Sequence, residues 1–112
     1  MIGIDTPETR RPGCGGRAAT AALRDRAEGR SARVIEDPTQ DRRDRYDRRL
    51  AVLVLEDGTD LGRRQVAEGH AAVYVFERPF RRLSGYRRAE RKARARLDGA
   101  WGACGGDFHR PE

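Results

Sequence analysis

The chain begins with the sequence MIGIDTPET, which constrains the fold more than any other stretch. Isoleucines at alternate positions predict a β-strand, and Pro7 keeps Thr6 out of the helical region and ends that strand. The carboxylate of Asp5 therefore stands at a strand end, and that of Glu8 in the loop beyond it. This arrangement suits a metal ligand beside a general base. Carboxylates at a strand end also serve as turn formers or helix caps, and that reading stays open.

Arginine dominates the charge of the chain. The 112 residues contain 24 Lys and Arg against 18 Asp and Glu, a net charge of +6, and Lys92 is the only lysine. The planar guanidinium suits phosphate recognition, so this balance favours a nucleic-acid partner. A charge that only keeps the protein soluble is the alternative. The length allows one domain, and no apolar run approaches the ~18 residues of a membrane span.

Local patterns predict helices and short strands. Apolar residues at helical spacing indicate a first helix that ends before Gly29, a short helix capped by Thr59 or Asp60, and a last helix capped by Ser84. Strands are expected over residues 32–36 and 50–55, and an extended segment over 71–76. The inner face of the last helix is predicted to consist of Tyr86, Ala89, Glu90, Ala93 and Leu97.

Cys14 and Cys104 are the only cysteines, and we expect them to form a disulfide. Cys14 precedes the first helix, and Cys104 follows Trp101, which should fold back onto the domain. Two free thiols in a cytosolic protein are the alternative. A disulfide would indicate a secreted or cell-surface protein. No spacing of cysteine and histidine predicts a zinc site.

Several motifs together resemble the thermonuclease family, that of staphylococcal nuclease. The sequence IDTPET at residues 4–9 is followed by DRYDRRLA at residues 44–51 and VAEGHA at residues 66–71. The turn over residues 58–61 and a last helix that ends in GAW at residues 99–101 continue the pattern. The resemblance rests on the order and spacing of these motifs along nearly all of the chain.

This resemblance implies an α+β protein, namely an OB-fold-type barrel of five strands with three helices. Residues 1–105 would form a partial domain that lacks the first two to three strands, and residues 106–112 a loose tail. An arginine five residues before Asp5 and a further acidic residue upstream, both part of the family pattern, have no counterpart here. Because a strand opens the chain at Met1, we expect an N-terminally truncated domain of low stability and reduced activity.

The resemblance also implies calcium-dependent cleavage of phosphodiester bonds in DNA and RNA. By match, Asp5 and the carbonyl of Thr6 are calcium ligands, Glu8 is the general base, and Arg48 stabilises the pentacoordinate phosphate. A cation and a guanidinium arranged around the phosphate counter the negative charge that develops there. Arg48 lies in an Asp/Arg-rich loop of the kind that is otherwise read as a solvated surface.

Further positions are matched to substrate binding. Arg45 and Tyr46 correspond to residues that hold a terminal phosphate, and Tyr74 and Phe76 to aromatic residues beside the base. A single-stranded nucleic acid, bound by a monomer, is the expected substrate. Asp47 replaces the glycine that is usual in the family, and its charge beside the catalytic arginine is expected to weaken phosphate binding. A non-catalytic OB-fold module that binds nucleic acid is therefore the second reading.

Overall fold

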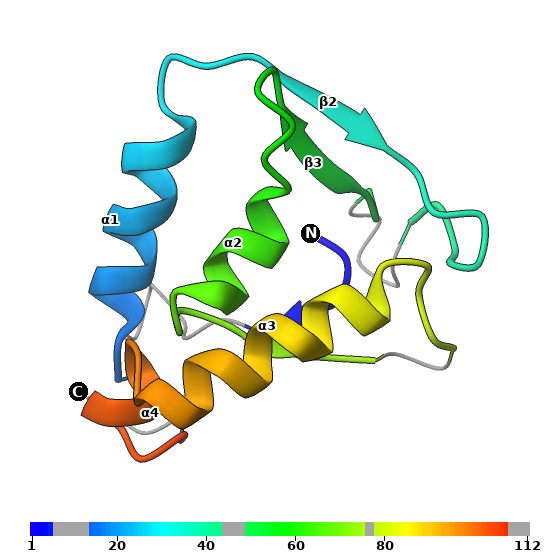
Figure 1. Cartoon of the computed structure of the whole chain (residues 1–112). Helices are drawn as coiled ribbons and strands as arrows, with labels where there is room; N and C mark the ends of the chain where they lie inside the picture. Colours follow the sequence, from blue (N-terminus) through cyan, green and yellow to red (C-terminus); the bar gives the residue numbers. More distant parts are fainter. Residues whose placement is uncertain (6–13, 44–48, 76–77, 108–112) are drawn as a thin grey trace.

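The computed structural model describes residues 1–5, 14–43, 49–75 and 78–107. Helices and strands follow one another along the chain, and Figure 1 labels them. Their order is β1 (Ile4–Asp5), α1 (Gly16–Ala27), β2 (Ala32–Ile35), β3 (Val52–Leu55), α2 (Leu61–Ala67), β4 (Ala72–Val73), α3 (Leu83–Arg96) and α4 (Ala100–Ala103). The fold is α+β, as the sequence predicted.

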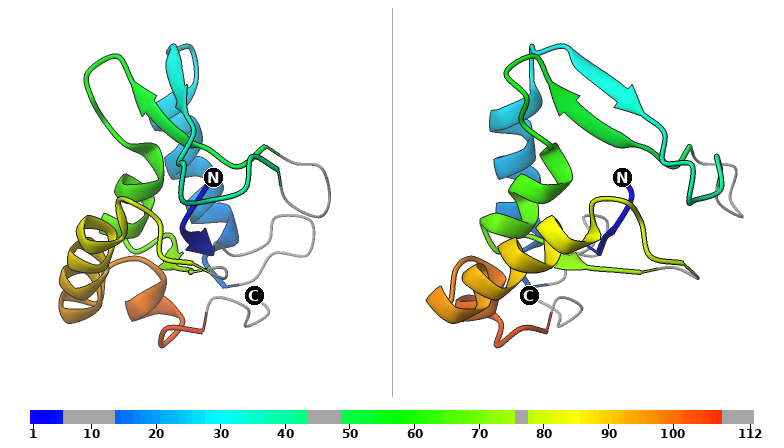
Figure 2. Two further views of the ribbon diagram at one scale, coloured as in Figure 1. Left: turned by 90° about the vertical axis from the view of Figure 1, so that its right-hand side faces the viewer. Right: turned by 45° about the vertical axis from the view of Figure 1, so that its right-hand side comes forward.

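The described strands form two antiparallel pairs, β1 with β4 and β2 with β3. The β2–β3 pair stands at one end of α2 and extends away from the helices (Figure 2). The strands expected over 32–36 and 50–55 are present but shorter, and the segment over 71–76 narrows to β4. The apolar pattern does not indicate where the pairing of β2 with β3 stops. Leu50 was expected in the strand, but its N–H donates to the Arg42 oxygen, outside the β2–β3 ladder.

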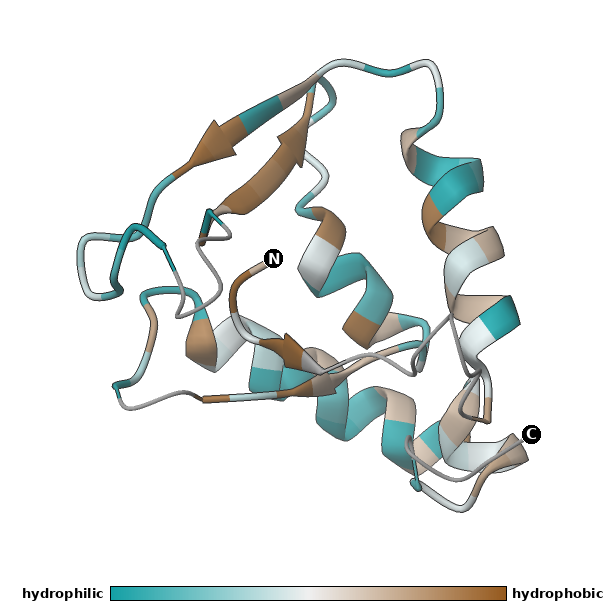
Figure 3. Ribbon diagram, turned by 180° about the vertical axis from the view of Figure 1, so that it is seen from behind, coloured by the Kyte–Doolittle hydropathy of each residue, from teal (hydrophilic) through white to brown (hydrophobic). Residues whose placement is uncertain are grey.

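The core lies between β3, α2 and α3. Phe80 and Tyr86 meet edge to face there, with ring centroids 5.0 Å apart, a favoured aromatic arrangement. Apolar residues gather on β1 and β3, whereas many residues of α3 are hydrophilic (Figure 3). The buried members of the core are Ile2, Val52, Val54, Val66, Ala71, Phe80, Tyr86 and Ala89.

The two ends of α3 differ from the sequence-based expectation. Arg82 is the N-cap residue and Ser84 lies inside the helix, so the prediction that Ser84 caps it is wrong. Leu97 is 66% exposed and adopts a left-handed conformation with φ of 56°, so its assignment to the inner face is also wrong. Helical spacing would bring Leu97 inward only if the helix continued through it, and α3 ends at Arg96.

Two close contacts hold the last part of the chain in place. The predicted disulfide between Cys14 and Cys104 is present and joins the segment before α1 to the end of α4. Gly69 has φ of 77°, and a Cβ there would collide with the Asp98 carbonyl. This glycine lets the Ala100 N–H donate to the Gly69 oxygen over 2.9 Å, which ties the end of α2 to α4.

Candidate nucleic-acid site

The structure describes only part of the predicted site. The backbone of Asp5 lies in β1, and Tyr74 directly follows β4 with 52% of its surface exposed. The remaining predicted catalytic, metal and substrate residues lie outside the described residues: Thr6, Glu8, Arg45, Tyr46, Arg48 and Phe76.

The first described segment, residues 1–5, is held by backbone hydrogen bonds on both sides. The Ile2 N–H donates to the Ala51 oxygen over 3.1 Å, and the Tyr74 N–H donates to the Gly3 oxygen over 2.9 Å. Gly3 has φ of 81°, and a Cβ there would collide with the Phe80 ring, so the segment packs closely only because this residue is glycine. The strand end at Asp5 is thus held between the residues before β3 and the residues of β4.

The predicted Arg45, Tyr46 and Arg48 lie in sequence between two described residues that pair with each other. Arg43 and Arg49 face one another in an antiparallel bridge. Two residues further on, Ala51 accepts the hydrogen bond that anchors the first segment. The two parts of the chain with the predicted catalytic residues therefore start from neighbouring backbone positions.

The predicted aromatic pair is also flanked by anchored residues. Beyond it, the Arg78 carbonyl accepts a hydrogen bond from the Gln40 side chain over 2.9 Å, and the Arg78 guanidinium pairs with Asp41 at 3.3 Å. Before it, the Glu90 carboxylate accepts a hydrogen bond from the Val73 N–H over 2.7 Å. This bond connects α3 to β4 immediately before Tyr74. Glu90 was predicted on the inner face of α3, and this contact confirms it.

Asp37 fixes the chain near the same region. Its carboxylate accepts hydrogen bonds from the Thr39 N–H and hydroxyl and from the Arg81 N–H over 2.7 Å. Burial acts to raise the pKa of Asp37, but these hydrogen bonds outweigh it, and the pKa lies below its ordinary value. An ionised Asp37 therefore connects the segment after β2 with the segment before α3.

A family profile described as staphylococcal nuclease homologue matches residues 1–103. The chain belongs to the staphylococcal nuclease homologue family. No curated protein matches the sequence.

Membership in the nuclease homologue family indicates a nuclease or a nucleic-acid-binding protein. The domain of this family is an OB fold, and the α+β structure with antiparallel strand pairs is consistent with that class. β1, the bridge at Arg43 and Arg49, and β4 form the backbone framework from which the segments with the predicted site residues start.

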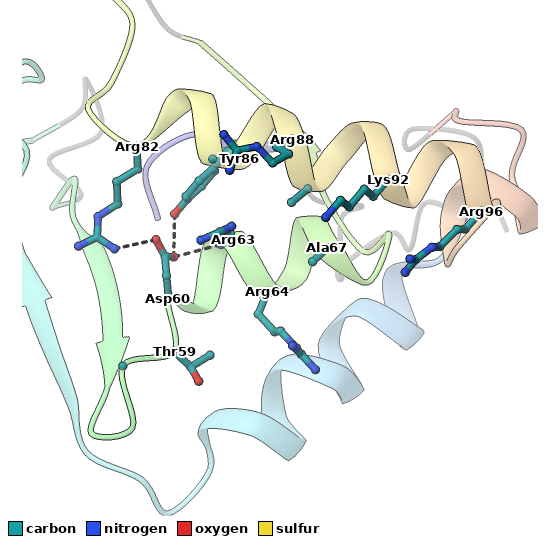
Figure 4. Close-up of a pocket in the computed structure, with 13 residues that line it drawn as sticks. Thr59, Asp60, Arg63, Arg64, Ala67, Arg82, Tyr86, Arg88, Lys92 and Arg96 are labelled. Atoms are coloured by element: carbon teal, nitrogen blue, oxygen red, sulfur yellow. Dashed lines mark hydrogen bonds and ion pairs between the residues drawn. The ribbon is translucent and has the colours of Figure 1, made fainter.

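A second feature of this nuclease homologue, a basic cleft of about 590 Å³ between α2 and α3, was not anticipated from the sequence. Figure 4 shows basic side chains from both helices along it. The available signal was the spacing of Arg88, Lys92 and Arg96, which lie four residues apart on one helix face. The basic residues that line the cleft are Arg63, Arg64, Arg82, Arg88, Lys92 and Arg96.

Among the residues that the structure describes, Asp60 is the one carboxylate that lines this basic cleft, and it is engaged within the protein. It accepts hydrogen bonds from the Tyr86 hydroxyl over 2.8 Å and the Arg63 N–H over 3.0 Å, and pairs with Arg82 at 3.1 Å. Burial, and secondly the Asp60 charge, raise the pKa of Tyr86, so the hydroxyl stays protonated and donates. Arg82 offsets the charge of Asp60, which leaves the cleft positive.

Proposed function

We propose that this protein is a calcium-dependent endonuclease that hydrolyses phosphodiester bonds of DNA and RNA. The observation that carries the proposal is the family match over residues 1–103. The backbone framework supports it, because Ile2 and Gly3, just before β1, form hydrogen bonds with Ala51, two residues after the Arg43–Arg49 bridge, and with Tyr74, where the aromatic segment starts.

The proposed roles divide the reaction among few groups. Glu8 accepts a proton from the attacking water, for which a carboxylate within hydrogen-bond reach is required. Arg48 donates hydrogen bonds to the phosphate oxygens where negative charge develops, which lowers the barrier. Arg45 and Tyr46 hold a terminal phosphate of the substrate. Tyr74, with its exposed ring, would stack on a base together with Phe76.

The donor set agrees in chemistry with calcium. Ca²⁺ prefers oxygen ligands and takes 6–8 of them, and Asp5 and the Thr6 carbonyl would supply two kinds of oxygen. Within the described ranges, no group of three or more His, Cys, Asp or Glu gathers. Water and substrate oxygens would complete the set of ligands. Bound calcium would supply positive charge beside the scissile phosphate.

The remaining assignments follow from the same proposal. We infer a five-stranded OB-type barrel, a monomer, and a preference for single strands, whose bases are free to stack on Tyr74 and Phe76. The Cys14–Cys104 disulfide is compatible with an exported protein, because disulfides persist in oxidising compartments. Across the described ranges, no helix has the length and apolar character needed to cross a membrane.

A plasmid-nicking assay with calcium or with a chelator tests the proposal. The wild type should nick DNA only with calcium, and Glu8→Gln and Arg48→Ala should each lower the rate by roughly 10² or more. Arg24→Gln, an exposed change on α1, is the control and should keep the wild-type rate. Full activity in either site variant would remove the role assigned to that residue.

A nucleic-acid-binding module without catalysis is the second candidate. Asp47, where the family usually has glycine, favours it, because a carboxylate next to Arg48 competes with the phosphate for that guanidinium. The basic cleft also favours it, since it offers binding without hydrolytic groups. Binding of a single strand with no calcium-dependent cleavage by either the wild type or Asp47→Gly would support this candidate.

A further inference from the structure

We propose that the basic cleft between α2 and α3 binds the phosphate backbone of a nucleic-acid strand at a distance from the hydrolytic site. This inference rests on the proposed function, because a strand held at the active site extends beyond it. The cleft would bind several successive phosphates of the strand and would make no sequence-specific contacts with the bases.

Much of the charge in the cleft is not neutralised by the protein. Arg64 pairs with Glu68 at 3.7 Å, and Arg82 pairs with Asp60 at 3.1 Å. Arg63, Arg88, Lys92 and Arg96 are exposed and, among the residues that the structure describes, none of these four forms an ion pair with a carboxylate. A wall of several uncompensated cations attracts a polyanion.

The basic residues form a row rather than a point. Arg88, Lys92 and Arg96 repeat every four residues on α3, so they lie above one another on one face of the helix. At a rise of about 1.5 Å per residue, the row is about 12 Å long. Arg63 faces this row from α2 (Figure 4). A single small anion would use only one end of such a row, whereas successive phosphates of a strand can contact all of it.

The chemistry of the cleft favours the backbone over the bases. Of the described residues, Tyr86 is the one aromatic residue that lines the cleft, and only 1% of its surface is exposed, so this described lining offers no exposed ring for a base to stack on. Arginine forms bidentate hydrogen bonds with phosphate. We therefore expect binding that depends on charge and is indifferent to sequence.

The cleft and β4, which leads into Tyr74 of the proposed hydrolytic site, lie on different sides of α3. Glu90 contacts β4 through the Val73 N–H, and a residue two positions from both Arg88 and Lys92 points to roughly the opposite side of an α-helix. The cleft therefore faces away from β4 and Tyr74. A long strand would have to pass around α3 to reach both places, whereas a short one would occupy only the hydrolytic site.

Two charge-matched double variants test the cleft. Arg88→Gln with Lys92→Gln removes two cleft cations, and Arg24→Gln with Arg33→Gln removes two exposed cations from α1 and β2. Binding of a labelled single strand of about 20 nucleotides, longer than the ~4–16 that one OB fold covers, is followed over a salt series with chelator present. The cleft pair should lower the salt slope by about 1.4 and the affinity at low salt several-fold more than the control pair does.

Additional measurements distinguish a failure of this inference from a failure of the proposed function. Binding with chelator does not require hydrolysis, so the salt slopes decide the cleft even if the wild type cleaves nothing. If it does cleave, the cleft pair should raise KM for the long strand and leave cleavage of a dinucleotide unchanged. Thermal melts check that each variant is folded. If Arg88→Gln with Lys92→Gln lowers the melting temperature, Arg63→Gln with Lys92→Gln is used in its place.

Two results would overturn the inference. Equal salt slopes for the cleft pair and the control pair would show that the cleft does not touch the strand. A loss of binding to poly-glutamate as large as the loss of binding to the strand would make the cleft a site for any polyanion, including an acidic protein.

Discussion

Two buried carboxylates, Asp60 and Asp37, join parts of the chain that lie far apart in sequence. Asp60 caps α2 through the Arg63 N–H and also receives the Tyr86 hydroxyl. Asp37 receives the N–H of Arg81, a residue 44 positions away. When such a carboxylate is removed, several hydrogen-bond donors lose their acceptor at once. This lowers the stability of the fold more than the loss of one surface contact does.

We predict that Asp60→Ala lowers the free energy of unfolding by about 3 kcal/mol, because it removes a helix cap and leaves the buried Tyr86 hydroxyl without an acceptor. Tyr86→Phe should cost only about 1 kcal/mol, since the cap to Arg63 remains. Urea denaturation measures both changes. Asp57→Ala, in the exposed turn before α2, is the control. An Asp60→Ala protein as stable as the wild type would contradict this account of the junction.

Stability should also depend on the ionisation of Asp37. Its pKa in the folded protein lies below the ordinary value of 3.8, so its contribution is complete above that value and is lost as the pH falls through the folded pKa. Asp37→Asn should cost about 2 kcal/mol near neutral pH, and the difference from wild type should shrink below about pH 3.8. Urea melts over a pH series measure it. A cost for Asp37→Asn that stays constant down to strongly acidic pH would refute the assignment.

The sequence predicts one half of the Asp60 junction. Thr59 or Asp60 is expected to cap the short helix, and in the structure the cap is Asp60. Its contact with Tyr86 joins residues 26 positions apart, and no local pattern encodes such a distance. The same holds for Glu90, which was placed on the inner face of α3, while its partner, the Val73 N–H, is known only from the fold.

At the level of elements, α3 shows where periodicity stops being informative. Tyr86, Ala89 and Ala93 are buried as the spacing predicts. Leu97 continues the same spacing but is exposed, because the chain turns into the left-handed region there. The sequence Asp98-Gly99 marks the end of a helix only to within a few residues. The row of cations on the other face of α3 can be recognised in the sequence. That α2 lies opposite this row and forms a cleft with it cannot.

We predict that Leu97→Gly stabilises the protein by about 0.5–1 kcal/mol. A non-glycine residue with φ of 56° carries a conformational cost that glycine avoids, and the exposed Leu97 side chain gives up little packing. Ala95→Gly, an exposed position in the last turn of α3, is the matched control and should destabilise by a similar amount. Thermal melts compare the two. A lower melting temperature for Leu97→Gly would show that the side chain packs more than its exposure indicates.

At the scale of the whole molecule, long-range connections decide the arrangement. Two described strand pairs and a core between β3, α2 and α3 hold the family motifs, while the disulfide joins residues 90 positions apart. The disulfide was predictable because the chain has one possible cysteine pair. The pairing of β1 with β4 brings together residues nearly 70 positions apart, and no local pattern in the sequence predicts it.

The last prediction concerns this disulfide. A cross-link that closes a loop of about ninety residues removes enough freedom from the unfolded chain to contribute roughly 4–5 kcal/mol in the chain-entropy description. Cys14→Ala with Cys104→Ala should therefore lower the urea midpoint strongly, and it should raise the m-value, because the unfolded chain exposes more surface without the link.

Wild-type protein treated with reductant separates the link from the packing of the buried Cys104 side chain, which is 2% exposed. Reduced wild type and the double variant should unfold at similar midpoints if the link is the main contribution. If the variant is much less stable than reduced wild type, packing dominates. Two alkylatable thiols in protein isolated from its native compartment, or an unchanged midpoint on reduction, would contradict the role of the disulfide and with it the argument for export.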